Sequence, residues 1–482
     1  MRTLDADVAV VGAGAAGLYA ALSAARAGGR VVLVSATPLA ESASYWAQGG
    51  LAAALATGDS PAKHLADTVS AGRGAVRASA ARVLAEEAPA VVEDLQELGV
   101  HFDADRRGRL ALGLEGGHSC RRVVHAGGSA TGRRITRELS AVAALDERIE
   151  LLERRRAVSL LCAEGHCCGL RCDDETPIRA RGVVLATGGA AALWSRTTNP
   201  AGAVGAGHLL ALGAGAALAD LELVQFHPTA VVAPDGADGF LVTEAVRGEG
   251  ARLVDATGER FVDELAPRDE VARAIEGRMR ATGAASVGLD MRAVDPALFP
   301  NVVTALHDAG FDPGRELVPV APASHYMMGG IATDLQGRST LPGLYAVGEC
   351  ACSGLHGANR LASNSLTECF VFGRRASAAA LQEPALAAGD IRGTDPLSSP
   401  RPSRQTRAAL WKHAGLERER AGLERLLDDP HPLARLISAS ALHREESRGA
   451  HRRRDAPDAN PALDGRHTVV GEDGEPAFEL WE

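Results

Sequence analysis

A glycine-rich turn near the N-terminus, GAGAAG at residues 12–17, constrains the fold of this chain more than any other feature. It follows the apolar, β-rich segment 8–11 and precedes the Ala-rich segment 18–27, after which 31–34 has the composition of a second buried strand. Glycines at this point let the backbone approach a pyrophosphate, and the N-terminus of the helix supplies partial positive charge and free N–H groups. The pattern predicts a βαβ unit that binds a dinucleotide, with a tight packing turn as the alternative.

The second predicted strand lacks the ending that would identify the dinucleotide. In units that bind NAD or FAD this strand usually ends in an acidic residue that binds a ribose. Here it ends in Ser35. A hydroxyl can also bond a ribose, so the turn by itself leaves NAD and FAD open.

Two later segments repeat the pattern of a buried strand that stops at glycine. They are RGVVLATGG at residues 181–189 and GLYAVGE at residues 343–349. Three strands that each end where a cofactor could approach indicate one α/β sheet assembled from distant parts of the chain.

Length and charge limit the classes of protein and partner. A chain of 482 residues, 46% of them hydrophobic, can bury several cores, so we expect two or three domains. The net charge of -10 gives no electrostatic reason to expect nucleic acid or an anionic membrane as a partner. Local positive charge must therefore hold any acidic substrate.

An uncharged run at residues 8–25 is long enough to raise the question of a membrane span or a signal peptide. Asp5 and Asp7 precede it where a signal would carry positive charge, and the glycines of the turn divide it into a strand and a helix. We therefore expect a cytoplasmic protein without a membrane partner. The eight cysteines lack the paired CxxC spacing of a zinc site, so we also expect free thiols and no metal.

A series of motifs along the chain resembles, in order, those of the succinate dehydrogenase and fumarate reductase flavoprotein family. The motifs are GAGAAG, SYWAQGG (44–50), EGGHS (115–119), VVLATGG, QFHPTA (225–230), TEAVRGEGARL, ELAPRD (264–269), ASHYMMGG (323–330), GLYAVGE and GLHGANRLASNSL (354–366). The resemblance covers about residues 5–375 and returns at HREESRGAH (443–451). It implies an α/β protein with a Rossmann-type FAD-binding domain, an inserted α+β capping domain and a short C-terminal helical module.

Changes in composition suggest where these domains begin and end. Charged residues mix with turns in the predicted insertion, Pro and Ser accumulate between 384 and 406 as in a linker, and the last thirty or so residues are polar, which predicts a loose tail. The expected boundaries are 1–220 for the first part of the FAD-binding domain, 221–326 for the capping domain that forms a substrate lid, 327–390 for the second part of the FAD-binding domain, and 400–482 for the helical module with its tail.

The resemblance also implies which residues bind FAD. They are Gly12, Gly14, Ala15, Ala16, Gly17, Ser35, Ser44, Tyr45, Trp46, Ala47, Gln48, Gly49, Gly50, Glu349, Ser365 and Leu366. Respiratory members link the flavin covalently through a His just before the AQGG segment, but Ala43 occupies that place, so we expect noncovalent FAD. The family usually has GDG where this chain has Gly205-Ala206-Gly207, which removes a polar contact and predicts weaker FAD binding.

A four-carbon dicarboxylate needs several cations or donors facing one spot, because two buried carboxylates without partners would be too costly. The motifs supply His227, Thr243, Arg268, His325 and Arg360. Arg360 suits a bidentate grip on one carboxylate, and the two histidines can hold the carboxylates. The resemblance implies that Arg268 exchanges a proton at the reacting carbon. If the resemblance is set aside, an Arg at the start of a helix, as in APRD, more often forms an ion pair there, and a lone His more often caps a turn.

Glu115 bears on the choice of substrate. In the members of the family that oxidise L-aspartate, the matching Glu meets the ammonium group, which succinate lacks. A carboxylate there would attract an amino acid and repel a plain dicarboxylate. The alternative is a loop Glu that caps the GGHS turn.

The resemblance thus implies FAD-dependent oxidation of L-aspartate to iminoaspartate, the opening step of de novo NAD biosynthesis, with molecular oxygen or fumarate reoxidising the flavin. A soluble fumarate reductase or succinate dehydrogenase flavoprotein is the first alternative, and a non-catalytic FAD-binding protein is the second. The sequence leaves open whether the next enzyme of NAD synthesis is a partner.

Overall fold

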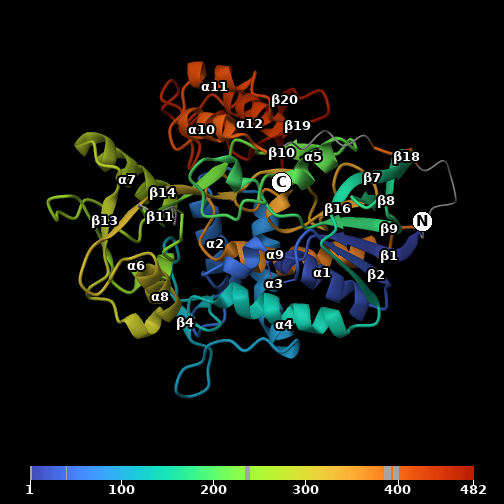
Figure 1. The fold of residues 1–482 in the computed structure, drawn as a ribbon, viewed down its shortest axis with the longest axis horizontal. Coiled ribbons are helices and arrows are strands. Elements are labelled where there is room, and N and C mark those ends of the chain that lie inside the picture. The colour runs from blue at the N-terminus through green and yellow to red at the C-terminus, as the bar shows by residue number, and fades with distance from the viewer. Residues whose placement is uncertain (1–2, 40, 234–238, 385–391, 395–400) are drawn as a thin grey trace.

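A computed structural model describes residues 3–39, 41–233, 239–384, 392–394 and 401–482. Its main layer is an eight-stranded sheet in the order β18-β7-β8-β9-β1-β2-β6, with β16 also paired to β9 (Figure 1). The strands are β1 (Leu4–Val11), β2 (Val31–Ser35), β6 (Ile149–Glu153), β7 (Ala157–Ala163), β8 (His166–Cys172), β9 (Pro177–Leu185), β16 (Leu344–Ala346) and β18 (Arg392–Gly393).

The three predicted strands that stop at glycine lie side by side. Val10 of β1 pairs in parallel with Leu33 of β2 and with Val184 of β9, and Val184 also pairs with Tyr345 of β16. Their carboxyl ends therefore meet at one edge of the sheet, which confirms the prediction of a single sheet built from distant segments.

Helices cover both faces of this sheet. On one face α1 (Ala15–Arg26) is buried nearly all round, because its small alanines allow it to fit between the strands and α9 (Asn364–Ala380). The same face carries α3 (Ala78–Glu97) and α4 (Thr131–Leu145). Leucines of α5 (Ala206–Leu212) and of the C-terminal helices pack in the core on the other face.

A second body extends from the sheet on two long antiparallel strands, β11 (Val224–Val231) and β14 (Val318–Met327) (Figure 1). They continue a four-stranded sheet in the order β11-β14-β13-β12, which has its own apolar core. Its other elements are α6 (Glu244–Gly248), β12 (Arg252–Val254), α7 (Arg268–Thr282), β13 (Val287–Asp290), η3 (Pro296–Leu298) and α8 (Pro300–Asp308). We refer to residues 224–327 as the cap.

The remaining elements form small sheets and connections. A three-stranded sheet has the order β3-β5-β4, and a five-stranded sheet has the order β17-β15-β10-β19-β20. Their short strands include β3 (Leu51–Ala52), β4 (Leu112–Gly113), β5 (Val123–Val124), β10 (Leu218–Ala219), β15 (Gly330–Ala332) and β17 (Ala351–Cys352). The connecting helices are η1 (Ala43–Trp46), α2 (Pro61–Ala71), η2 (Ala191–Leu193), η4 (Gly348–Cys350) and η5 (Pro461–Leu463).

The C-terminal region is helical, as predicted, over α10 (Arg404–His413), α11 (Arg420–Leu426) and α12 (Pro432–His443). The prediction of a loose tail is wrong, because β19 (Arg466–Val470) and β20 (Pro476–Leu480) form a hairpin that extends the sheet of β10. Most of the predicted linker at 384–406 lies outside the described residues. Among the described helices, none combines the length and the apolar character needed to cross a membrane.

Two buried histidines predict how stability depends on pH. Burial lowers the pKa of both His64 and His208 to about 4, whereas a histidine in the unfolded chain has a pKa near 6.5. Below pH 6.5 the unfolded chain therefore binds more protons, so the free energy of unfolding falls as the pH decreases toward 4. We expect His208→Leu to reduce this loss by about 2–3 kcal/mol at pH 4.5, measured by urea unfolding at several pH values. His101→Leu, at an exposed site, is the control, and equal pH profiles for all three proteins would contradict the prediction.

Candidate active site

The glycine turn lies between β1 and α1 and has room for nothing but glycine at two positions. Gly12 has φ +108°, and a Cβ there would lie 2.2 Å from the carbonyl oxygen of Ala186. A Cβ on Gly17 would lie 1.8 Å from the carbonyl oxygen of Gly12. The turn thus packs backbone against backbone at the carboxyl edge of the sheet, where a cofactor phosphate could approach.

The N-terminus of α1 is open to such a ligand. Gly14 is its N-cap residue and makes no side-chain cap hydrogen bond. The N–H of Ala15 donates to the hydroxyl of Ser44 at 3.1 Å, which brings the 44–50 segment against the turn. A glycine turn below a helix N-terminus fits a pyrophosphate, and Ala16 and Gly17 lie in the same first turn as Ala15.

The other strand ends place polar groups along the same edge. Ser35 is buried at the end of β2 and donates to the carbonyl oxygen of Thr37 at 2.7 Å. Glu349 follows β16 and accepts from the N–H of Met327 at 3.0 Å, and burial raises its pKa to about 7. A Cβ on Gly189 would lie 2.2 Å from this carboxylate, which explains why the strand before it stops at a glycine pair.

The 44–50 segment connects the turn to the cap. Its η1 carries Tyr45 and Trp46, whose rings meet edge to face at 5.2 Å, and Trp46 is 61% exposed. Gln48 donates from Nε2 to the carbonyl oxygen of Leu241 in the cap at 2.6 Å. A Cβ on Gly50 would lie 2.2 Å from the carbonyl oxygen of Val124. The segment therefore has little freedom to accept larger residues after Gln48.

The candidate substrate residues converge between the cap and the N-terminus of α9. Pairing of β11 with β14 places His227 opposite Ala323, so the rings of His227 and His325 lie 5.0 Å apart. Burial and the charges of Arg268 and Arg360 hold the pKa of both histidines well below the ordinary value. Both rings are therefore neutral at neutral pH.

The hydrogen bonds of His227 indicate its tautomer. Its Nδ1 accepts from the N–H of Thr229 at 3.2 Å, so the proton lies on Nε2, which is available to donate. His325 shares a hydrogen bond of 2.7 Å with the hydroxyl of Thr198 through Nδ1. Thr243 is buried nearby as the N-cap residue of α6.

Arg360 lies just before α9 and is buried. Its guanidinium lies 4.4 Å from the ring centre of Tyr326, and it donates to the hydroxyl of Ser365 at 2.7 Å. Burial, followed by the charge of Arg268, lowers the pKa of Arg360 to about 10. Ser365 and Leu366, in the first turn of α9, thus lie beside the guanidinium that could hold a carboxylate.

Arg268 is the first residue of α7 and is held by two acceptors. Its Nε donates to Glu244 at 2.6 Å and its Nη1 donates to Gln225 at 3.1 Å. Glu244 is buried, also accepts from the N–H of Gly116 at 2.7 Å, and lies 3.5 Å from Arg247. The guanidinium of Arg268 therefore has a fixed position in the cluster.

Glu115 lies at the side of this cluster with its carboxylate buried. One oxygen, Oε2, accepts from the hydroxyl of Ser363 at 2.6 Å. The other, Oε1, lies 3.8 Å from Nε2 of His125 and makes no hydrogen bond within the described residues. Burial opposes ionisation, but the neighbouring His125, the hydrogen bond from Ser363 and the charge of Arg268 lower the pKa of Glu115 to about 2. The site thus contains a buried carboxylate ion with one unsatisfied oxygen.

Four residues of the site were missed by sequence reasoning. Gln225 and Glu244 lie inside motifs that the sequence shows, beside His227 and Thr243, so their position in the motif was an available signal. Ser363 lies inside the motif GLHGANRLASNSL and so had the same signal, whereas His125 lies outside every motif. Ser363 has φ +60° and bridges Glu115 to the N–H of Gly50, a contact between residues far apart in the sequence.

Ala206 stands where the family usually has the Asp of a GDG loop. The substitution removes the carboxylate and leaves the backbone of the loop intact. Gly205 has φ +73° and is the N-cap residue of α5, and a Cβ on Gly207 would lie 1.9 Å from the hydroxyl of Thr187. Ala206 itself is exposed. Only the polar group of a GDG loop is therefore missing.

Comparisons with known proteins agree with this geometry. The FAD binding domain family matches residues 7–366, and the family named fumarate reductase flavoprotein C-term matches residues 426–480. The structure is similar to a quinol-fumarate reductase with menaquinol molecules, with a TM-score of 0.90 and 29% identity over 100% of this chain and 98% of the other. These matches define a flavoprotein of the fumarate reductase class whose cofactor is FAD.

The relatives found by sequence define the family more narrowly. The L-aspartate oxidase of Streptomyces coelicolor is 42% identical over 97% of this chain and 91% of its own length. That of Caulobacter vibrioides is 46% identical over 96% of both chains, and that of Mycobacterium tuberculosis is 43% identical over 97% of this chain and 96% of its own. The chain belongs to the L-aspartate oxidase family.

The geometry of the turn predicts the effect of a methyl group at Gly14. A Cβ there would lie 3.2 Å from the hydroxyl of Ser44, a side chain that can move, so the fold should survive. The methyl group would stand where a pyrophosphate approaches, and we expect Gly14→Ala to weaken FAD binding about tenfold, or about 1.4 kcal/mol. Quenching of flavin fluorescence during titration of the apoprotein measures this. Gly277→Ala, on α7 with no atom within 4 Å, is the control, and unchanged FAD affinity in Gly14→Ala would refute the placement of the phosphates.

Proposed function

We propose that this chain catalyses the FAD-dependent oxidation of L-aspartate to iminoaspartate, the entry reaction of de novo NAD biosynthesis, in the cytoplasm. The observation that carries the proposal is the ionised, buried Glu115 with an unsatisfied oxygen beside a cluster of arginines and histidines. Such a site attracts one positive group and two negative groups, which is the charge pattern of an amino dicarboxylate.

The cationic part of the cluster binds the two carboxylates. Arg360 binds one carboxylate through its planar guanidinium. His227 donates a hydrogen bond from Nε2 to a carboxylate, and His325 also contacts the carboxylates. Both histidines are neutral, so they contribute hydrogen bonds without adding charge to a site that already holds Arg268. Thr243 adds a hydroxyl from the start of α6.

Glu115 binds the amino group. Its Oε1 accepts from the amine, while Ser363 keeps Oε2 in place. Succinate and fumarate offer nothing to this oxygen, and a substrate carboxylate turned toward it would be repelled. Glu115 therefore orients the substrate as well as selecting it.

Arg268 moves the proton at the reacting carbon. Glu244 and Gln225 fix its guanidinium in one orientation, and the carboxylate of Glu244 compensates a cation at the first position of α7, where the helix dipole disfavours it. In the reduction of fumarate the guanidinium donates a proton to the substrate, and in the oxidation it accepts one in its neutral form, after it has released its own proton to solvent.

FAD, when bound, supplies the acceptor for the electron pair of the substrate and later passes it to oxygen or to fumarate. The residues that hold it are those of the glycine turn, Ser35, the 44–50 segment, Glu349, Ser365 and Leu366. Ala43 offers no side chain for a covalent link, so the cofactor is noncovalent. Residues 221–326 act as a lid over the flavin that 1–220 and 327–390 bind, and 400–482 support them.

Anaerobic bleaching of the flavin tests the proposal. The purified protein, loaded with FAD, is mixed with L-aspartate or with succinate, and the absorbance of the oxidised flavin is followed. We expect L-aspartate to reduce the flavin and succinate to do so slowly or not at all. Faster bleaching by succinate would favour a succinate dehydrogenase or fumarate reductase flavoprotein, and bound FAD that neither compound reduces would favour a non-catalytic protein.

A further inference from the structure

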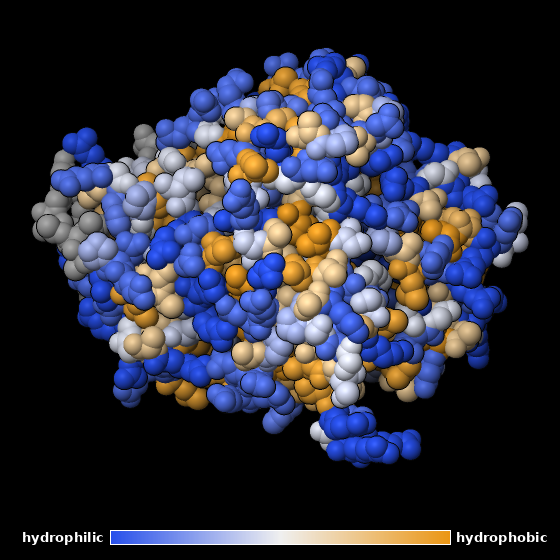
Figure 2. All heavy atoms as spheres, turned by 180° about the vertical axis from the view of Figure 1, so that it is seen from behind, coloured by the Kyte–Doolittle hydropathy of each residue, from blue (hydrophilic) through white to orange (hydrophobic). Residues whose placement is uncertain are grey.

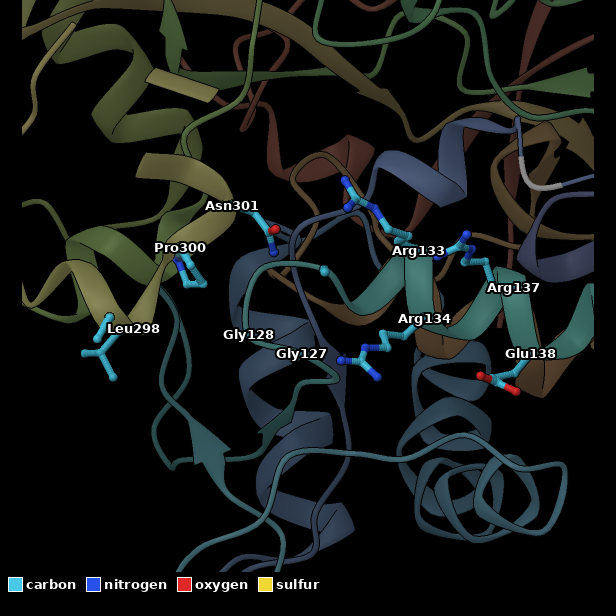
Figure 3. Close-up of a pocket in the computed structure, with 11 residues that line it drawn as sticks. Gly127, Gly128, Arg133, Arg134, Arg137, Glu138, Leu298, Pro300 and Asn301 are labelled. Carbon is cyan, nitrogen blue, oxygen red and sulfur yellow. The ribbon is translucent and has the colours of Figure 1, made fainter. Parts of the chain in front are cut away.

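A cavity lies between the start of α4 and the cap. Its volume is about 730 Å³, and its walls come from both bodies of the molecule (Figure 3). One wall is the loop at Gly127 and Gly128 with the first two turns of α4, and the other is the segment from η3 to the start of α8. None of the residues proposed above to bind substrate or FAD lines it.

Three arginines of α4 line this cavity, which we call the arginine pocket. Figure 3 shows Arg133, Arg134 and Arg137 on the α4 side, with Asn301 on the cap side. Glu138 is the single acidic residue of the lining. Within the described part of the chain, no carboxylate lies within ion-pair distance of the three guanidinium groups, and Nε of Arg133 is buried without a hydrogen-bond partner.

These charges destabilise the helix that carries them. Arg133 and Arg134 stand in the first turn of α4, which has no acidic residue, at the positive end of the helix dipole. Arg137 follows Arg133 by four residues and Arg134 by three, the spacings at which like charges on a helix repel each other. Within the described residues these charges are compensated only in part, by the ring of Tyr45 at 5.5 Å from the guanidinium of Arg133 and by Glu138, four residues after Arg134. A bound anion would reduce the remaining repulsion.

We propose that the arginine pocket binds a small multivalent anion that carries phosphate or carboxylate groups. The planar guanidinium matches both groups through paired N–H donors. The volume of the pocket lies within the range of roughly 300–1,000 Å³ that is usual for small-molecule sites. Because the walls belong to α4 and to the cap, the anion would join the cap to the FAD-binding domain.

Calorimetric titration of the FAD-loaded protein at low ionic strength tests this with two probes, inorganic pyrophosphate and citrate. We expect at least one of them to bind, and the double variant Arg134→Gln/Arg137→Gln to bind it at least tenfold more weakly. Tighter binding of pyrophosphate would identify a phosphate ligand, and tighter binding of citrate a carboxylate ligand. Arg82→Gln, at an exposed position of α3, is the matched control and should bind as the wild type does. If neither anion binds, or if the double variant binds as tightly as the wild type, the proposal is wrong.

A charge reversal separates loss of binding from loss of fold. Arg134→Glu places an acidic residue in the first turn of α4 and three residues before Arg137, but also four residues before Glu138, so the melting temperature of the anion-free holoprotein should stay close to that of the wild type. Pyrophosphate or citrate should raise the melting temperature of the wild type and not that of the variant. A variant that melts lower than the wild type and is still stabilised by the anion would overturn the proposal.

Discussion

Arg268→Met should lower kcat with L-aspartate by about three orders of magnitude or more while the protein remains yellow with bound FAD. General acid–base groups contribute roughly 10²–10⁴-fold to a rate, and the variant also loses a donor that orients the substrate. Methionine fills much of the space of the arginine stem, and Glu244 keeps its bonds from Gly116 and its pairing with Arg247. The expected loss therefore lies in the chemical step and not in cofactor binding.

Stopped-flow reduction of the flavin by L-aspartate measures this step directly. Arg273→Met, one turn further along α7 and partly exposed, is the matched control and should reduce its flavin at nearly the wild-type rate. A variant at Arg268 that retains more than a tenth of the wild-type rate would remove Arg268 from the proton transfer.

The position of Arg268 also depends on contacts between the cap and the FAD-binding domain. Arg73, in the loop after α2, pairs with Asp269 at 3.3 Å and with Glu270, the two residues that follow Arg268. Gln48 reaches the cap from the other side through the carbonyl oxygen of Leu241. The proposed catalytic cluster is therefore complete only when the cap lies against the cofactor domain.

Local pattern was enough to predict much of the fold. The strands around the glycine turn could be predicted because their burial on both faces leaves continuous apolar runs that stop at glycine. The C-terminal hairpin could not, since β19 is short and polar and is held by distant partners. Thr468 donates to Asp220, and Arg444 of the preceding segment pairs with Glu222 at 2.6 Å in the interior. Such pairings have no periodicity in the sequence.

The candidate site, like the fold, could be predicted from the sequence only in part. The motifs indicated which residue types would gather, and the pairing of β11 with β14 explains why His227 and His325 do so. The contact of Ser363 with Glu115 spans 248 positions of the chain and uses a left-handed backbone that is uncommon outside glycine. The motif at 354–366 includes Ser363 but does not indicate a role that depends on its conformation and on a distant partner, and His125 lies outside the motifs.

Glu115→Gln should convert a site for an amino dicarboxylate into one for a plain dicarboxylate. Glutamine has nearly the same shape, and its carbonyl oxygen can accept from Ser363 as Oε2 of Glu115 does. Its amide group then faces the substrate amine with two donors in place of an acceptor. Loss of a charge-assisted hydrogen bond of about 1.5–3 kcal/mol corresponds to a fall of roughly 10–150-fold in kcat/KM for L-aspartate.

Fumarate reduction separates this effect from general damage to the site. Fumarate has no amine, so its reduction by the chemically reduced flavin should change by less than about fivefold, and removal of the negative charge should favour its binding if anything. Glu86→Gln, at an exposed position of α3, is the control for an unrelated carboxylate.

Because the pKa of Glu115 is about 2, the carboxylate is ionised at every pH above about 4. The ratio of kcat/KM between wild type and variant should therefore show no contribution from titration of Glu115 between pH 5 and 7. Equal kinetics with L-aspartate in wild type and variant would mean that the amine is bound elsewhere, and the unsatisfied oxygen of Glu115 would then need another partner.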